Sequence, residues 1–191
     1  MRRTTRTRDT RETNISVEVN LDGTGKHDLQ VTPAFFSHML ATFSTHSLID
    51  ITMSASGDLT HHIIEDAALV LGQAMNEALG KRKDIARFGF AFTPMECSLA
   101  RAAIDLAERP YAVVDLGFKG ERIEKTATED LVHFIRSFAF SMKIDLHVNI
   151  EYGENDHHRA EAAFKAIALA IRQAIAERGT EQLPQSTKGC L

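Results

Sequence analysis

The sequence contains no tryptophan and only two cysteines, four prolines and two tyrosines among its 191 residues. Cys97 and Cys190 are far apart and lack the spacing of a metal-binding pair. The sequence therefore predicts no disulfide framework and favours the reducing cytoplasm as location. No apolar stretch is long enough to cross a membrane, and the pattern of a secretory signal peptide is missing. A membrane partner is not expected.

An excess of positive charge is also missing. Asp and Glu number 26 against 22 Lys and Arg, which gives a formal net charge of −4. Nucleic acid is therefore not an expected partner. The local exception is a Thr-rich start that carries Arg2, Arg3, Arg6, Arg8 and Arg11. A nucleic-acid arm or an organelle address are alternatives for residues 1–13. We favour a solvated, partly ordered leader, because a strand pattern begins directly after it.

Histidine and glutamate, in contrast, form a pattern that occurs twice. His-His-x-x-Glu stands at His61-His62-x-x-Glu65 and again 96 residues later at His157-His158-x-x-Glu161. A single histidine precedes each copy at nearly the same distance, His38 by 23 residues and His133 by 24. The repetition indicates an internal duplication and ligands for two divalent metal ions.

The hydropathy pattern divides the chain into two similar halves, residues 14–92 and 93–191. Alternating apolar residues predict strands over 15–21, 26–31 and 49–55, and again over 99–106, 111–118 and 144–150. Helical spacing predicts helices from Pro33 onward, over 61–79, 129–142 and 157–177. In each half the second strand is expected to return beside the first after a turn, and residues 81–95 form a junction. The predicted class is α+β, with two strand-strand-helix-strand-helix halves packed through their helices as one cooperative unit.

The spacing of the motif matters because each copy is predicted at the start of a helix. The first His and the Glu are four residues apart, so both project from one face and can bind one ion. The second His is rotated by roughly 100° and points toward another ion. We expect one metal on His38, His61, Glu65 and His158, and the other on His62, His133, His157 and Glu161. Three imidazoles and one carboxylate suit Mn²⁺, Fe²⁺ or Zn²⁺ and leave positions open for substrate. His27 and His147 lie outside the pattern, whereas His46 could lie near the site.

Several segments together resemble the imidazoleglycerol-phosphate dehydratases, from about residue 10 to the C-terminus. They are Phe36-Ser37-His38-Met39-Leu40, the first His-His-x-x-Glu-Asp, Arg109-Pro110-Tyr111, Asn155-Asp156-His157-His158, Glu161-Ala162-x-Phe164-Lys165-Ala166 and Ser186-Thr187-Lys188-Gly189. The resemblance implies a lyase of histidine biosynthesis with two Mn²⁺ per active site and a fold like domain 2 of ribosomal protein S5. It also implies a homo-oligomer of 24 subunits with ligands from neighbouring subunits. The family's eight metal ligands match the eight residues above.

The resemblance also assigns residues to the phosphorylated imidazole substrate. Glu12, His46, Glu65 and Glu161 match catalytic positions, and Glu12 and His46 are candidates for proton transfer. The substrate-binding set comprises Glu12, His38, His46, His61, Glu65, Arg87, Arg109, His157, Lys165, Ser186, Thr187 and Lys188. Two positions depart from the family. Ser37 replaces the usual Asp before the first ligand, and Thr60 replaces an acidic residue in a segment that is three residues shorter.

The implied reaction is the dehydration of imidazole glycerol phosphate to imidazole acetol phosphate. Two metal ions would hold the ring as an imidazolate, which can expel the hydroxyl group of the side chain. Two other functions fit the ligand pattern alone. One is a binuclear metallohydrolase of a phosphorylated small molecule, and the other is a scaffold whose histidines only join subunits through metal.

Overall fold

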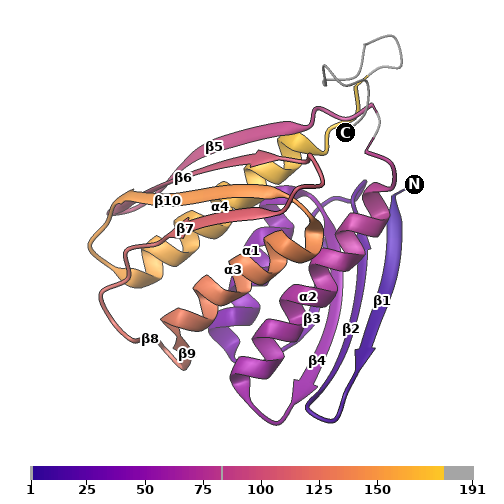
Figure 1. Ribbon diagram of the computed structural model, residues 1–191. Helices are drawn as coiled ribbons and strands as arrows, with labels where there is room; N and C mark the ends of the chain where they lie inside the picture. The colour runs from indigo at the N-terminus through magenta and orange to yellow at the C-terminus, as the bar shows by residue number, and fades with distance from the viewer. Residues whose placement is uncertain (1, 83, 179–191) are drawn as a thin grey trace.

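The computed structural model describes residues 2–82 and 84–178, and its elements repeat in order (Figure 1). The first half contains β1 (Arg3–Asp9), β2 (Thr13–Asn20), β3 (His27–Gln30), α1 (Ala34–Ser47), β4 (Asp50–Gly57) and α2 (Thr60–Leu79). The second contains β5 (Phe88–Met95), β6 (Ser98–Asp105), β7 (Tyr111–Asp115), α3 (Thr128–Met142), β10 (Asp145–Tyr152) and α4 (Asp156–Ala174). A short hairpin of β8 (Arg122–Ile123) and β9 (Thr126–Ala127) precedes α3. The duplicated α+β class is thus confirmed.

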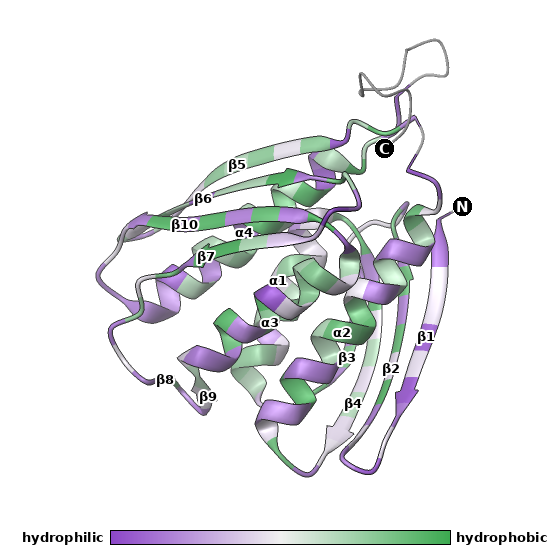
Figure 2. Ribbon diagram, in the orientation of Figure 1, coloured by the Kyte–Doolittle hydropathy of each residue, from purple (hydrophilic) through white to green (hydrophobic). Residues whose placement is uncertain are grey.

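Two four-stranded sheets with the same topology enclose the helices. Their strand orders are β1-β2-β4-β3 and β5-β6-β10-β7. In each sheet the strand after the first helix pairs antiparallel with the second strand and parallel with the third. Figure 1 shows the sheets on the outside and the helices between them, and Figure 2 shows hydrophobic and hydrophilic residues alternating along these helices.

Alternating side chains explain why each sheet has a buried face. In β2, Ile15, Val17 and Val19 are buried while the residues between them are more exposed. Burial of such side chains stabilises each by roughly 1.5–3 kcal/mol relative to exposure. The helices complete the core, with the Phe36 ring edge-on to the Phe134 ring at 5.0 Å between centroids. No helix in the described ranges is long and apolar enough to span a membrane.

The expected pairing of the first two predicted strands in each half was wrong. β3 lies beside β4 rather than β2, and β7 lies beside β10 rather than β6. The helix between β3 and β4 permits a parallel crossover, which brings β4 back between β2 and β3. Hydropathy alternation locates a strand but does not identify its neighbour.

The predicted leader and the predicted boundary between the halves also need correction. Arg3–Asp9 form the edge strand β1, and its arginines pair with Glu18, Glu77 and Asp66. This strand is polar on both faces, so no apolar alternation marks it. The boundary at residues 92 and 93 falls inside β5, which lies in the predicted junction. Phe88, Phe90 and Phe92 of β5 are exposed and smaller residues face α4, so the usual pattern is reversed.

The helices pair across the duplication. α1 of the first half packs against α4 of the second half, and α2 packs against α3. This cross-pairing decides which histidines meet.

Candidate active site

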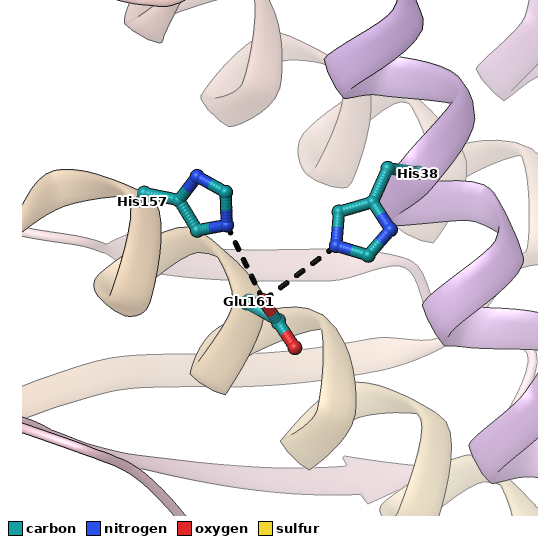
Figure 3. Close-up of side chains that lie close together, drawn as sticks. All are labelled: His38, His157 and Glu161. Atoms are coloured by element: carbon teal, nitrogen blue, oxygen red, sulfur yellow. Dashed lines mark ion pairs between the residues drawn. The ribbon is translucent and has the colours of Figure 1, made fainter.

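The first candidate group joins α1 and α4. His38 comes from α1, and His157 and Glu161 stand one turn apart at the start of α4. Their ligand atoms lie within 4.8 Å of one another. Glu161 Oε2 is 3.6 Å from His38 Nε2 and 3.4 Å from His157 Nε2, and Figure 3 shows both rings turned toward the carboxylate.

The second group is its counterpart and joins α2 and α3. Glu65 lies between two histidines, with Oε2 3.8 Å from His61 Nε2 and Oε1 3.3 Å from His133 Nε2. These three ligand atoms also fall within 4.8 Å of one another. Both groups therefore contain two imidazoles and one carboxylate.

The structure corrects the expected assignment of the single histidines. His38 does not join His61 and Glu65 of its own half but lies with His157 and Glu161. His133 lies with His61 and Glu65. The cause is the packing of α1 on α4 and of α2 on α3. The first His and the Glu of each motif do share a face, as their spacing predicts.

The second histidine of each motif points away from the first His and the Glu, as its rotation predicts, but it does not join the other group of the same chain as expected. His62 Nδ1 is 2.8 Å from Asp58 Oδ1 and 3.9 Å from Glu12 Oε2. His158 Nδ1 is 3.4 Å from Cys97 Sγ, and its Nε2 is 3.8 Å from Glu96 Oε2. In the described ranges of the chain, neither histidine belongs to one of the two groups. Both side chains are partly exposed.

The surroundings of the two groups differ. In the second group, Asp130 Oδ1 is 2.6 Å from His61 Nδ1, which fixes the ring and leaves Nε2 facing Glu65. In the first group, the ring of Phe35 lies 4.9 Å from that of His157. Asn155 caps α4 by accepting from the backbone N–H groups of His157 and His158. This cap orders the turn that carries both histidines.

Lys165 extends the first group along α4. Its Nζ is 2.8 Å from Glu161 Oε1. Burial alone would raise the pKa of Glu161, but the hydrogen bond and the positive charge of Lys165 outweigh it and lower that pKa. Burial lowers the pKa of His46, near the end of α1, and the charge of Lys165 lowers it further, against the opposing effect of Glu161. Lys165 thus lies beside the first group, and its charge also acts on His46.

The remaining predicted residues are dispersed. Glu12 lies beside His62, on the turn between β1 and β2. The Arg87 N–H donates to the carbonyl of Ala174 at the far end of α4, and the side chain pairs with Asp105 at 2.7 Å. Seventeen residues of helix at 1.5 Å each separate Ala174 from His157, or roughly 26 Å. Arg87 therefore cannot reach the first group of its own chain.

Arg109 lies at the same end of the second sheet as Arg87. It is exposed and precedes Tyr111, whose N–H donates to the carbonyl of Ile144 beyond the end of α3. Ser186, Thr187 and Lys188 lie outside the described residues. Among the described residues, the Ser37 hydroxyl forms no hydrogen bond with His38.

Sequence reasoning missed the partners that orient the histidines. Asp58 precedes His62 by four residues, a short spacing that could have drawn attention to it, whereas Asp130 is 69 residues from His61 and no local signal connects them. Cys97 is remote in sequence from His158, and no local signal connects them. The hydrogen bond with His158 and the backbone N–H of Glu154 lower the pKa of the Cys97 thiol to about 6.

The donor atoms fit a divalent cation. Each group offers two imidazole nitrogens and one carboxylate, the set that suits Mn²⁺, Fe²⁺ and Zn²⁺. His61 Nδ1 already has a carboxylate partner, as is usual for a histidine that binds metal through Nε2. Three donors leave coordination positions for further ligands.

The fold and the paired groups define a class of internally duplicated α+β proteins with two His/His/Glu clusters in the helix layer. Comparison with known proteins is more specific. The sequence profile described as Imidazoleglycerol-phosphate dehydratase matches residues 32–171. The chain belongs to this family of enzymes.

Relatives and solved structures agree over nearly the whole chain. The Imidazoleglycerol-phosphate dehydratase of Dehalococcoides mccartyi strain CBDB1 is 48% identical, covering 96% of this chain and 94% of its own. That of Chloroherpeton thalassium is 45% identical, covering 100% and 98%. The Staphylococcus aureus enzyme superposes with a TM-score of 0.85 at 28% identity, covering 92% and 99%. The Pyrococcus furiosus enzyme, in complex with (S)-C348, gives 0.84 at 35%, covering 97% and 100%.

Proposed function

We propose that this chain dehydrates imidazole glycerol phosphate to imidazole acetol phosphate in histidine biosynthesis, in the cytoplasm. The observation that carries the proposal is the duplicated pair of His/His/Glu groups in a member of the dehydratase family. We assign one Mn²⁺ to His38, His157 and Glu161 and another to His61, Glu65 and His133. When bound, these ions supply Lewis acidity that lowers the pKa of the imidazole N–H and stabilises negative charge on the ring.

The fourth ligands are His62 and His158, supplied by neighbouring subunits. Both histidines are directed away from the groups of their own chain, toward Glu12 and Glu96 respectively. The distance of Arg87 from the first group agrees with the same arrangement, since Arg87 could contact a substrate at a first group only in another subunit. The assembly is a homo-oligomer, which we propose to contain 24 subunits.

The chain's own residues then bind the substrate and move protons. His46 has a lowered pKa and is therefore neutral near pH 7, so it can accept a proton. Glu12 lies beside His62 and is the second candidate for proton transfer. Lys165, with Arg87, Arg109 and residues 186–188, provides cationic and hydroxyl donors for the phosphate. Phosphate binding remote from the reacting carbons would hold the ring in place.

The test is to incubate metal-stripped protein with imidazole glycerol phosphate, with and without Mn²⁺, and to assay both the ketone and inorganic phosphate. Manganese-dependent ketone formation without phosphate release is the expected result. Phosphate release would identify a metallohydrolase. Metal binding by a large particle without either product would identify a scaffold and overturn the proposal.

A further inference from the structure

The second histidines of the two motifs are held by chemically different partners. His62 Nδ1 faces the carboxylate of Asp58 at 2.8 Å, whereas His158 Nδ1 faces the sulfur of Cys97 at 3.4 Å. A histidine that binds metal through Nε2 must carry its proton on Nδ1 and donate it to an acceptor. Asp58 can act as that acceptor for His62. For His158, the facing atom is Cys97 Sγ.

The position of Cys97 is fixed by its surroundings. It lies on the turn between β5 and β6, and its sulfur accepts the backbone N–H of Glu154 at 3.4 Å. The loop before α4 reaches this turn through Gly153, where a Cβ atom would stand 2.4 Å from Ser98 Oγ. The same loop continues into the Asn155 cap of α4. The loop before α4 therefore contacts the sulfur through the Glu154 N–H and leads directly into the helix that carries His158.

We propose that Cys97 is a positioning residue for His158, whose Nδ1–H donates to the sulfur so that Nε2 is directed outward to bind metal. The opposite arrangement, with the thiol donating to Nδ1, would place a proton on Nε2 and block it. The inference rests on the proposed metal sites. It assigns to Cys97 the role that Asp58 has for His62, in the other half of the duplication.

The hydrogen bonds that hold His62 and His158 differ in strength. Sulfur is a weaker hydrogen-bond acceptor than a carboxylate oxygen, and it lies farther from its histidine, at 3.4 Å against 2.8 Å. His158 is consequently held less firmly than His62. The metal that depends on His158 should be the first of the two to be lost when chelator is added.

The experiment measures Mn²⁺ binding to the full-length assembled protein by calorimetry, alongside kcat and KM. Cys97→Ala should weaken one of the two Mn²⁺ sites by roughly 10–100-fold, the usual effect of removing a partner of a ligand histidine. Cys97→Asp should restore binding, because a carboxylate accepts from Nδ1. Asp58→Ala is the matched variant in the other half, and Cys190→Ser controls for loss of a thiol. Unchanged circular dichroism of each variant excludes unfolding.

Three outcomes separate the inference from its alternatives. Wild-type Mn²⁺ affinity in Cys97→Ala overturns it, whereas a wild-type protein that binds no Mn²⁺ would instead refute the proposed metal sites. Replacement of Mn²⁺ by Co²⁺ tests whether the sulfur itself is a ligand. An intense sulfur-to-cobalt charge-transfer band in the wild type, lost in Cys97→Ala, would show direct coordination and also overturn the inference.

Discussion

At the residue scale, the histidines of the duplicated pattern all offer imidazole nitrogens but occupy different positions relative to the two groups. His61 and His157 each face a glutamate one turn away, and each lies opposite a histidine from the other half. Replacing either by alanine removes one of three donors from a group. We expect His61→Ala and His157→Ala to lose the metal of their group and to reduce turnover to background.

His27→Ala is the matched control for these variants. His27 is exposed on β3 and contacts the carbonyl of Gly25 at 3.4 Å, outside both groups. Metal content by elemental analysis and ketone formation should be unchanged in this variant. Full activity of His61→Ala with stoichiometric metal would contradict the assigned groups.

Acidity should weaken metal binding at the second histidines. The hydrogen bond with Asp58 raises the pKa of His62, and that with Cys97 raises the pKa of His158. A raised pKa means that the protonated ring persists to higher pH, and a protonated ring cannot bind metal. Mn²⁺ affinity is therefore expected to fall as pH decreases from about 8 to about 6, with the fall beginning above the ordinary histidine pKa of roughly 6.5. A titration that gives equal affinity at both ends would count against His62 and His158 as ligands.

At the scale of elements, the close approach of α2 and α3 sets the geometry of the second group. Gly72 of α2 is where they approach closely, since a Cβ atom there would be 2.8 Å from the carbonyl oxygen of Phe138. Gly72→Ala should force the helices apart and destabilise the protein by about 1–3 kcal/mol, despite the better helix propensity of alanine. The melting temperature is expected to fall, together with Mn²⁺ affinity at the His61 group.

Gln73→Ala provides the comparison on the same helix. Gln73 is exposed, so its replacement raises helix propensity without a clash. Its melting temperature should be equal to or slightly above that of the wild type. If Gly72→Ala behaves like Gln73→Ala, the contact between the helices is more tolerant than the structure indicates.

The helices and strands differ in how well the sequence predicts them. Helices α2 and α4 were predicted within a few residues because their apolar stripes have a 3.6-residue period. β1 and β5 were missed because one is polar on both faces and the other exposes its aromatic residues. A hydropathy pattern reflects burial. Edge strands that are held by backbone hydrogen bonds and ion pairs therefore give only a weak pattern in the sequence.

At the scale of the whole molecule, the duplication alone did not identify which histidines meet. The eight candidate ligands were found from spacing, and the facing of each first His and Glu followed from the helix period. The partners of His38 and His133 depend on how the halves pack, which is a property of the tertiary structure. Each group takes residues from both halves, so neither half can form a complete group by itself.

Metal binding is also expected to connect one subunit with the next. His62 and His158 lie apart from the groups of their own subunit, so as fourth ligands they would connect subunits through metal. Removing metal with a chelator should therefore reduce the particle mass measured by light scattering, and Mn²⁺ should restore it.

The double variant His62→Ala/His158→Ala distinguishes this linkage from a general effect of the ion. It keeps both His/His/Glu groups and should still bind Mn²⁺, but more weakly by at least the roughly 10–100-fold that loss of an outer partner costs, because each site loses a ligand. The large particle should not reform, whereas His27→Ala should reassemble as the wild type does. A double variant that regains full mass on addition of Mn²⁺ would mean that contacts other than metal hold the subunits together, and that the second histidines act within a preformed assembly.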